Sequence, residues 1–583
     1  MNSALDRRMT RRRFVGASAA TLAALAAYGC APPSSPTSER APAGGPGAVN
    51  RSAQAVVGMG AYGPPATMTN VGGLSGDQGG DLQMIAHSSL SVIDHDSNVI
   101  PMLAERLPSA DDGTWVVNPD GTMRLTWHLR RNARWHDGHP FTSRDVRFSW
   151  EFNNDRALPI STTSVHQNVT SIDLPDDYTV VMHWKLTTGF AHVLTRSDLT
   201  LHPEHIVRPA WEAGDVDRLL AHPQFHEGFV GLGPYRIERW GQDGTVVFKP
   251  FEDFYLGPPK IGTLVHYSAS NAVGVLTQLL AGTIQKTSRN GLGFEEGITA
   301  RDEWEARGEG KVYFMPIGCR RLLMPQEYNP IFRDVRVRRA LLHAIDREQL
   351  GATLYGGQAP VAHFPLSPQE PGFAAAEAAA AKYAFDPRRS LALMEDAGWR
   401  RGSDGVLANA AGERFEIPFR VPVADNEQVR LQGAVAGFWS DIGVRARVDN
   451  ASDAQLRDRQ LRETYPGIAT TDSGPTIASL SRRWHSSNIP RAENRYVGDN
   501  AAHWSHPEAD RILEQVDRTF RKDEMESLLV QFARLYSEEL PALTLYYTPE
   551  VTAVHRSLKG ARPRATGSGQ NTWNWSCYQW EWV

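Results

Sequence analysis

From about residue 52 to the C-terminus, strand and helix patterns alternate along the chain without a long low-complexity gap. Residues 123–129 place Met, Leu, Trp and Leu at every second position, which is typical of a half-buried strand. Residues 334–350 instead space apolar side chains three or four apart, from Val337 to Ile345, which predicts one buried stripe of a helix. We therefore expect a mixed α/β protein. Because 583 residues are too many for one hydrophobic core, we expect two or more lobes.

Two further helices carry start signals. In FDPRRSLALMEDAGW (385–399), we expect Asp386 to cap the helix, Pro387 to take its first position and Gly398 to end it. In HPEADRILEQVDRTF (506–520), Pro507 marks the start in the same way. The apolar positions of this second helix that we expect to face the core are Ile512, Leu513, Val516 and Phe520.

The N-terminal segment is typical of an export signal. Several arginines precede an apolar run from Phe14 to Tyr28, which is shorter than the roughly twenty residues of a membrane span. TRRRF (10–14) resembles a twin-arginine motif. Cys30 closes the run as in a lipoprotein box, although Ala27 stands where such a box usually has Leu. We expect a twin-arginine-like lipoprotein signal at 1–30, with Cys30 as the lipid anchor. The alternative is an ordinary N-terminal membrane helix.

Residues 31–51 are rich in Pro, Ser, Ala and Gly and have few large apolar groups. Such a segment buries too little surface to fold, so it is predicted to be a flexible tether. No other stretch reaches eighteen apolar residues. We therefore expect an exported protein that is periplasmic or attached to the outer face of the cytoplasmic membrane.

Charge and motif content argue against two classes of function. The chain has 61 basic and 66 acidic side chains and a net charge of −5, so nothing indicates a nucleic-acid partner. We find no Gly-x-Ser-x-Gly, His-Glu-x-x-His or phosphate-binding loop, and therefore expect no catalytic residue and no cofactor. A secreted hydrolase remains a remote alternative. Cys319 and Cys577 could pair in an exported protein, but the sequence leaves this open.

The stretch RWHDGHPFTSRDVRFSWEF (134–152) contains two histidines in a turn. His136 and His139 could hold a metal, but no third ligand is identifiable, and a zinc site takes three or four protein ligands. Thr142 and Asp145 have the spacing of a helix capping box. We therefore interpret this stretch as scaffold and expect no metal site.

Several blocks together are similar to one family. PMLAERLPS (101–109) and LRRNARWHDGHPFTSRDVRFSWEF (129–152) resemble the most characteristic block of the dipeptide/oligopeptide class of ABC-transporter solute-binding proteins, bacterial family 5. Further blocks follow in the family's order over roughly residues 55–555. They are GLGPYRIERW (231–240), IFRDVRVRRALLHAIDREQL (331–350), FDPRRSLALMEDAGW (385–399), FWSDIGVRARV (438–448), WSHPEADRILEQVDRTF (504–520) and LPALTLYYTPEVTAV (540–554).

The resemblance implies an α/β, two-lobed type II periplasmic-binding-protein fold with an extra inserted subdomain. Within a solute-binding body at 52–583, lobe I is expected at about 52–75, 211–305 and 540–583. The inserted subdomain is expected at about 76–210, and lobe II at about 306–539. The ligand would lie between lobes that close by hinge bending, and a membrane permease would recognise the closed form. We expect a monomer.

The resemblance also implies a ligand and a site. Peptide binders of this family hold the peptide like an added strand and pair an acidic side chain with its ammonium group. In GIATTDSGPTIASL (467–480), Asp472 is the candidate for that acid. The alternative is that Asp472 caps the turn before Gly474 and Pro475.

Other cleft candidates lie in RRWHSSNIPRAENRY (482–496), for which a solvated loop is the alternative interpretation. These candidate ligand-binding residues are Trp484, His485, Asn488, Arg491 and Tyr496.

The chain also departs from the family pattern near the expected cleft. Gln285 stands where the family usually has Asp, and MPQ (324–326) replaces the usual Asn segment. These departures leave a second ligand class open, such as an oligosaccharide, an opine-like compound or a chelated metal.

Overall fold

The computed structural model describes residues 55–62, 67–69, 77–160, 165, 168–196, 198–288, 291–423, 425–452, 455–456, 458–563 and 574–583. The predicted signal, Cys30 and the predicted tether lie outside these residues. In the described part of the chain, no helix is both long enough and apolar enough to cross a membrane.

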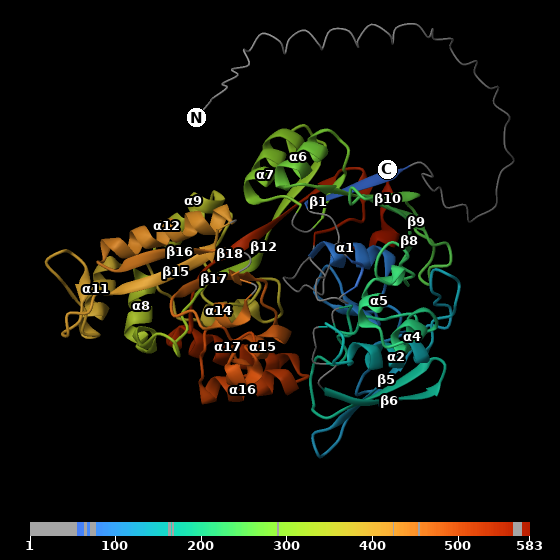
Figure 1. The fold of residues 1–583 in the computed structure, drawn as a ribbon, viewed down its shortest axis with the longest axis horizontal. Helices are drawn as coiled ribbons and strands as arrows, with labels where there is room; N and C mark the ends of the chain where they lie inside the picture. The colour runs from blue at the N-terminus through green and yellow to red at the C-terminus, as the bar shows by residue number, and fades with distance from the viewer. Residues whose placement is uncertain are drawn as a thin grey trace, which may run out of the picture. The chain divides into compact units, whose positions relative to one another are not determined.

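A ten-stranded mixed sheet forms the centre of the fold (Figure 1). In spatial order its strands are β16 (Arg445–Ala451), β15 (Glu416–Pro422), β17 (Ile468–Ser473), β12 (Gly310–Leu323), β18 (Ala542–His555), β11 (Lys286–Thr287), β1 (Val56–Tyr62), β10 (Thr263–Ala269), β9 (Val246–Pro250) and β8 (Tyr235–Trp240).

Two long strands connect the two ends of this sheet. β12 and β18 pair antiparallel from Gly310 opposite His555 to Leu323 opposite Ala542. β18 also pairs with β11 near one end, while β12 pairs with β17 near the other. The ladder between β12 and β18 shifts register between Arg320 and Arg321, and also just after Pro316, which faces Pro549. Since proline has no backbone N–H to donate, two facing prolines weaken the ladder at this point.

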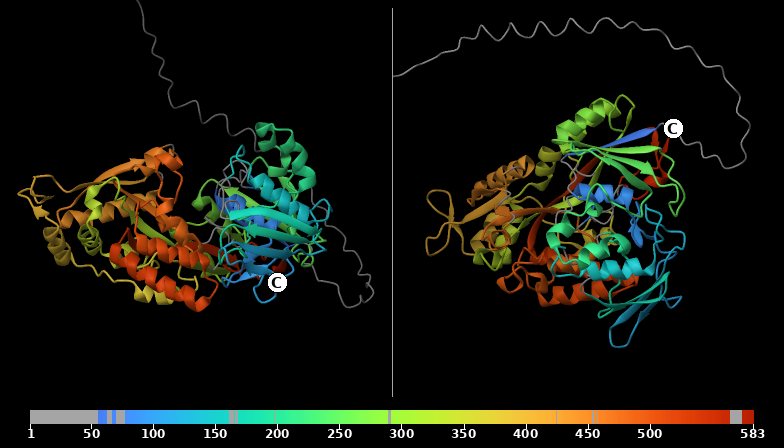
Figure 2. Two further views of the ribbon diagram at one scale, coloured as in Figure 1. Left: turned by 90° about the horizontal axis from the view of Figure 1, so that it is seen from below. Right: turned by 45° about the vertical axis from the view of Figure 1, so that its right-hand side comes forward.

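Helices cover both faces of the sheet around β12 and β17 (Figures 1 and 2). One core contains residues of α8 (Val335–His343), α9 (Arg347–Tyr355), α11 (Pro387–Asp396) and α12 (Asn426–Asp441). Another contains residues of α10 (Phe373–Ala379), α15 (Leu480–Trp484), α16 (Pro507–Arg518) and α17 (Lys522–Glu539). Leu322 packs in the first core and Leu323 against the second, because consecutive side chains of a strand point to opposite faces.

A separate four-stranded antiparallel sheet lies earlier in the chain. Its order is β4 (Trp115–Val117), β5 (Met123–His128), β7 (Thr179–Trp184) and β6 (Val169–Asp176). The alternating pattern at 123–129 is thereby confirmed as a strand, since Met123, Leu125 and Trp127 are buried and the residues between them are not.

Shorter elements complete the described part of the chain. The remaining strands form the two-stranded sheets β2 (Ser91–Ile93) with β3 (Val99–Pro101), β13 (Arg400–Arg401) with β14 (Leu407–Ala408), and β19 (Leu558–Lys559) with β20 (Glu581–Trp582). The remaining α-helices are α1 (Asp77–Ala86), α2 (Ser143–Asn153), α4 (Glu204–Glu212), α5 (Val216–Leu220), α6 (Ala272–Leu280), α7 (Phe294–Thr299) and α14 (Arg459–Glu463).

The helix start signals are confirmed, with one correction. The Asp386 side chain accepts a hydrogen bond from the Arg389 backbone N–H at 2.9 Å, and Pro387 opens α11. Pro507 opens α16 and its apolar stripe is buried. The prediction that Phe520 faces inward is wrong, because α16 ends at Arg518 and Phe520 is 50 % exposed. Because the backbone is no longer helical after Arg518, Phe520 does not lie on the same face as the apolar residues of α16.

The two histidines of the 134–152 stretch make structural contacts. The His136 ring lies within hydrogen-bond distance of the Gly233 carbonyl oxygen at 3.0 Å, and it accepts from the Gly231 N–H at 3.2 Å. His136 therefore fastens its turn to the loop before β8. The His139 ring stacks on His205 with centroids 4.1 Å apart. The Asp145 carboxylate accepts from the Thr142 N–H at 2.9 Å, as the capping-box spacing predicts.

Cys319 and Cys577 do not form a disulfide. Cys319 and Cys577 are both buried and both free, so the pairing that the sequence left open is not formed. Burial raises the pKa of the Cys319 thiol to about 12. This thiol is therefore protonated at neutral pH and behaves as a small apolar side chain.

Candidate functional site

The candidate site is built on two neighbouring strands. Arg320 of β12 pairs with Asp472 of β17, and the next pair is Arg321 with Thr471. Side chains directly opposite each other in an antiparallel pair share a face, and the following pair points to the other face. The first pair therefore faces one helix layer, and the second pair faces the other.

On the first face, one guanidinium is shared by two carboxylates. Arg320 Nη2 lies 3.0 Å from Glu427 Oε1 and 3.2 Å from Asp472 Oδ2. Glu427 comes from the first turn of α12. The Thr548 hydroxyl of β18 donates to Asp472 Oδ1 at 2.5 Å. We call Arg320, Glu427, Asp472 and Thr548 the acid cluster.

The acid cluster places two carboxyl groups against one guanidinium at the boundary with solvent. The Arg320 side chain is 3 % exposed, while Glu427 and Asp472 are 29 % and 26 % exposed. Burial, with a smaller contribution from Asp472, raises the pKa of Glu427 against the opposing effect of Arg320. Burial alone would lower the pKa of Arg320, but the two carboxylates outweigh it and raise that pKa. The guanidinium is thus firmly charged, and two carboxyl groups share it.

Gly318 allows the acid cluster to form. A Cβ atom at this position would lie 2.5 Å from Asp472 Oδ1 and 2.6 Å from Thr548 Oγ1. Both distances are far below van der Waals contact, so only glycine fits beside this hydrogen bond. Gly318 follows Pro316 closely, which places the cluster beside the register shift between Pro316 and Gly318 in the β12–β18 ladder.

The second face holds a small cavity of about 50 Å³. It lies between β12, β17 and α15, and the loop that follows completes it. The residues lining it include Arg321, Leu323, Thr471, Arg483, Trp484 and Asp499. We call it the arginine cavity. Arg321 is 1 % exposed, and its guanidinium lies 5.8 Å from the centroid of the Trp484 ring.

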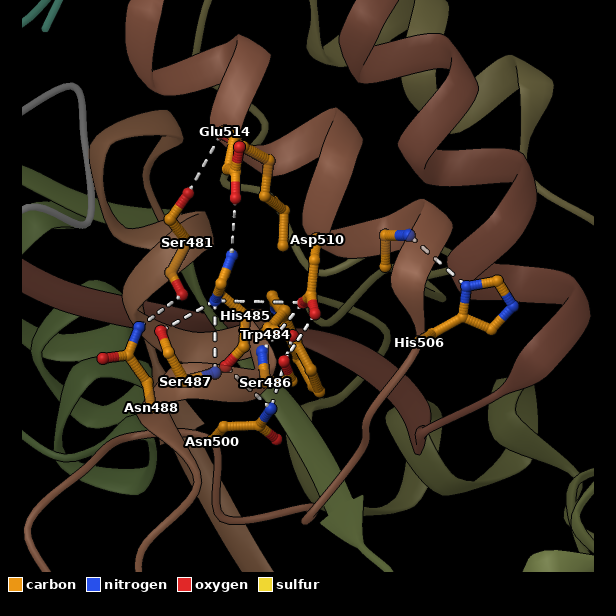
Figure 3. A network of polar contacts seen from close by, with 12 residues as sticks. Ser481, Trp484, His485, Ser486, Ser487, Asn488, Asn500, His506, Asp510 and Glu514 are labelled. Carbon is orange, nitrogen blue, oxygen red and sulfur yellow. Dashed lines mark hydrogen bonds and ion pairs between the residues drawn. The ribbon is translucent and has the colours of Figure 1, made fainter. Parts of the chain in front are cut away.

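The segment that begins with Trp484 is held by its own polar contacts (Figure 3). The Trp484 ring is 3 % exposed and packs edge-on against Tyr536 with centroids 4.8 Å apart. His485 Nδ1 accepts from the Ser487 N–H at 3.1 Å, and its Nε2 lies 3.6 Å from the Glu514 carboxylate. The Asn488 side-chain amide donates to the Ser481 carbonyl oxygen at 3.0 Å. His485 and Asn488 therefore shape the segment.

A second, larger cavity of about 460 Å³ lies beside the same segment. This volume is within the range of small-molecule sites. Its lining residues are Ser486, Ser487, Ile489, Arg491, Glu493 and Asn494. The Arg491 guanidinium lies 3.4 Å from the Glu327 carboxylate and is about half exposed.

The six predicted ligand-binding residues do not lie together in one site. Trp484 lines the arginine cavity, and Arg491 lines the larger one. Asp472 belongs to the acid cluster, where it bonds to β12 and β18. Tyr496 has a backbone φ of +56°, an uncommon left-handed conformation for a residue other than glycine. His485 and Asn488 line neither cavity.

Sequence reasoning missed the charged residues around these sites. Arg320 and Arg321 stand in GCRRLLM (318–324), where two adjacent cations interrupt an otherwise apolar strand. That interruption was the available signal, because arginine is rarely buried without a specific partner. Glu427 and Arg483 lie on helices and carry no comparable signal.

Comparisons with known proteins agree on one family. The model of the bacterial extracellular solute-binding proteins, family 5 Middle, matches residues 98–489. The oligopeptide-binding protein AppA of Bacillus subtilis (strain 168) is 21% identical over 514 residues, which cover 86% of this chain and 88% of AppA.

Solved structures share the fold. An oligopeptide-binding protein from Thermus thermophilus, complexed with a pentapeptide, has a TM-score of 0.73 at 23% identity and covers 90% of this chain and 96% of its own. NikZ from Campylobacter jejuni, in complex with Ni(L-His), has a TM-score of 0.70 at 21% identity and covers 90% of this chain and 99% of its own. These likenesses establish the two-lobed periplasmic-binding-protein fold that the sequence predicted.

Proposed function

The chain belongs to the bacterial extracellular solute-binding proteins of family 5, and from this premise we propose that it is the solute-binding component of an ABC importer. It captures short peptides outside the cytoplasm and delivers them to a membrane permease. The proposed role is binding and release, and we assign no catalytic residue to it.

The observation that carries this proposal is the position of the polar groups on the sheet. The acid cluster and the arginine cavity lie on opposite faces of the β12–β17 pair, next to the register shifts of the β12–β18 ladder. Since β12 and β18 connect the two ends of the sheet, a change in strand geometry at Pro316 and Pro549 would move these ends relative to each other. Ligand capture coupled to such a movement is a hinge closure.

For the lobes we propose the boundaries that the sequence suggests, with lobe I at about 52–75, 211–305 and 540–583. The inserted subdomain takes about 76–210 and lobe II about 306–539. A ligand that contacts both lobes would bind the closed state better and shift the population toward it. The permease would then recognise the closed state.

For the ligand's ammonium group we propose Asp472 as the partner. The excess of carboxyl groups over cations in the acid cluster and the partial exposure of Asp472 support this role. The ammonium would share the carboxylate with Arg320 and Thr548. Trp484, His485, Asn488, Arg491 and Tyr496 are proposed as further ligand-binding residues, of which Trp484 and Arg491 line cavities.

A non-peptide solute is the second candidate within the same transport role. The relative with a similar fold that binds Ni(L-His) supports it, as do the departures from the family pattern near the expected cleft. Attachment to the outer face of the membrane through a lipid on Cys30, and a monomeric state, complete the proposal.

The test is to identify what the protein carries. The full-length chain is purified gently, and its bound solutes are weighed by native mass spectrometry. We expect a ladder of masses that resolves into mixed short peptides. A single non-peptide mass would keep the transport role and replace the ligand. If the protein is empty, thermal shifts are measured with an equimolar library of di- to pentapeptides, and no shift with any of them would refute peptide binding.

A further inference from the structure

Two segments far apart in the sequence meet at the end of α16. The Asp517 carbonyl oxygen accepts a hydrogen bond from the Gly189 backbone N–H at 2.7 Å. Asp517 belongs to the last turn of α16, where carbonyl groups lack an N–H partner one turn further along the helix. The bond therefore satisfies a group that the helix leaves open, and it joins the segment after β7 to the turn between α16 and α17.

Aromatic side chains add to this contact. The Phe520 ring packs edge-on against the Trp115 ring of β4, with centroids 4.8 Å apart. Phe190, next to Gly189, packs against the core that contains residues of α10, α15, α16 and α17. Every other described residue of that core lies within residues 323–542. The contact thus joins the region of the four-stranded sheet to the helices around β12 and β17.

The two backbones approach each other closely at Gly189. A Cβ atom at this position would lie 2.2 Å from the Thr519 carbonyl oxygen. This distance is far below van der Waals contact, so only glycine permits the approach. A larger residue at position 189 would require either a local distortion or a separation of the two segments.

Each side of the contact is also anchored in its own part of the fold. The Thr187 hydroxyl donates to the Gly121 carbonyl oxygen at 2.9 Å, in the turn between β4 and β5. On the other side, the Thr519 hydroxyl donates to the Glu524 carboxylate at 2.6 Å, in the first turn of α17. Because each segment has contacts that do not involve the other, the two can separate while both parts stay folded.

We propose that residues 187–190 and 517–520, together with Trp115, form a clasp that closes the inserted subdomain on lobe II. With the boundaries proposed above, residues 187–190 and Trp115 belong to the inserted subdomain, and residues 517–520 belong to lobe II. Contacts between domains of one chain are commonly small and allow relative motion, as this one does. The inference rests on the proposed solute-binding function and adds a conformational device to it.

The clasp stabilises the closed state through contacts within the protein. The ligand-free chain is therefore partly closed before a solute arrives. Since the apparent affinity of a solute rises with the fraction of the binding-competent state, the clasp strengthens binding without touching the solute.

Two variants open the clasp from opposite sides, and each has a matched control. Phe520→Ala removes the contact with Trp115. Phe385→Ala removes a similar edge-on pair, with Phe438, that lies within lobe II, and both phenylalanines are about half exposed. Gly189→Ala inserts a Cβ atom between the two segments, while Gly433→Ala adds one where nothing lies within 4 Å.

Each full-length protein is dialysed exhaustively against buffer without solute before it is measured. The radius of gyration from small-angle X-ray scattering reports opening, and hydrogen exchange with mass spectrometry reports protection of the peptide that contains position 189. We expect Phe520→Ala and Gly189→Ala to have a larger radius of gyration than the wild type. Their exchange in this peptide should be about tenfold or more faster, as the loss of a hydrogen bond and an aromatic contact implies. The two controls should match the wild type.

The melting temperature separates a clasp from a fixed part of the core. In a clasp, opening relieves the overlap in Gly189→Ala, so this variant should melt close to Gly433→Ala. A much lower melting temperature with an unchanged radius of gyration would make the contact part of a fixed core and overturn the inference. Unchanged radius and exchange in folded Phe520→Ala and Gly189→Ala would also overturn it.

These results leave the proposed transport function intact, because that function is judged by the solute that the protein carries. Conversely, if the variants open as expected but the wild type binds no peptide, the clasp is supported and the peptide ligand is refuted.

Discussion

At the scale of single residues, neighbours in the sequence have opposite surroundings. Arg320 forms ion pairs with Glu427 and Asp472, whereas the adjacent Arg321 lies beside the Trp484 ring on the other face. No sequence pattern distinguishes these two arginines, because their environments come from segments about 100 or more residues away. The sequence indicated Asp472 and Trp484 through resemblance alone, and it could not show which face each one occupies.

The proposed role of Asp472 can be tested by removing its charge while keeping its shape. Asp472→Asn should weaken binding of Ala-Ala-Ala with a free ammonium by about tenfold or more. N-acetylated Ala-Ala-Ala should bind both proteins equally. The affinities are measured by calorimetry, and Asp523→Asn, at an exposed position of α17, is the matched control. If Asp472→Asn bound the peptide with a free ammonium group as tightly as the wild type does, Asp472 would have only a structural role between β12, β17 and β18.

Buried histidines predict loss of stability in acid. Burial lowers the pKa of His202 to about 3, and burial together with His202 and His136 lowers that of His87 to about 3. The unfolded value is about 6.5, so between these values the unfolded chain binds more protons than the folded one. Their stabilising contribution is complete above about pH 6.5 and is lost as the pH falls toward 3.

The measurement is the free energy of unfolding from urea titrations between pH 7 and pH 4. We expect it to fall steadily with pH, and His202→Leu should flatten this dependence. The two ring nitrogens of His202 have no hydrogen-bond partner among the described residues, so leucine removes no bond there. His183→Gln, at a partly exposed position, should retain the wild-type slope. A His202→Leu slope equal to that of the wild type would contradict the assignment.

At the scale of elements, local sequence patterns predicted the helices and strands whose limits follow from apolar periodicity and from helix-capping residues. The β5 strand, the Asp386 cap and the start of α16 appear as the sequence indicates. Phe520 was misplaced because a helical period carries no information about where the helix ends. The ten-stranded order, which brings β17 beside β12 and β12 beside β18, was beyond any local pattern. The site depends on that order, so its geometry could not be read from sequence.

Gly318 provides an element-scale prediction about the β12–β18 ladder. Gly318→Ala should lower the free energy of unfolding by about 1–3 kcal/mol, because its Cβ would overlap the Asp472–Thr548 hydrogen bond. Gly437→Ala is the matched control, since nothing lies within 4 Å of its Cβ position on α12. That substitution should raise stability by about 0.5–1 kcal/mol. Thermal and urea unfolding measure the stability of both variants. If Gly318→Ala changed the free energy of unfolding no differently from Gly437→Ala, β12 would be able to shift and accommodate the added methyl group.

At the scale of the whole molecule, the folded body and the predicted N-terminal signal rest on different evidence. The family match and the described elements concern the body, while residues 1–54 lie outside the described residues. Export and lipid attachment therefore rest on the sequence pattern around Cys30 alone. The two-lobed class was predictable because its blocks occur in a fixed order over most of the chain, whereas the identity of the solute depends on a few side chains.

The lipid anchor can be tested by cell fractionation. Cys30→Ser removes the thiol that would carry the lipid, so the protein should move from the membrane fraction to the soluble fraction. Immunoblots of both fractions measure the distribution, and Ser34→Ala in the predicted tether should leave it unchanged. Retention of Cys30→Ser on the membrane would favour an uncleaved N-terminal membrane helix.

The alternation along β12 has an evolutionary implication. Because Arg320 and Arg321 serve chemically separate compartments, selection can retune one of them while the other keeps the strands together. A point mutation on the Arg321 side would thus leave the contacts of Arg320 with Glu427 and Asp472 in place. An insertion or deletion of one amino acid upstream in β12 would do the reverse and swap both compartments at once. Evolutionary change at these two positions should therefore proceed by replacement, with the length of β12 held constant.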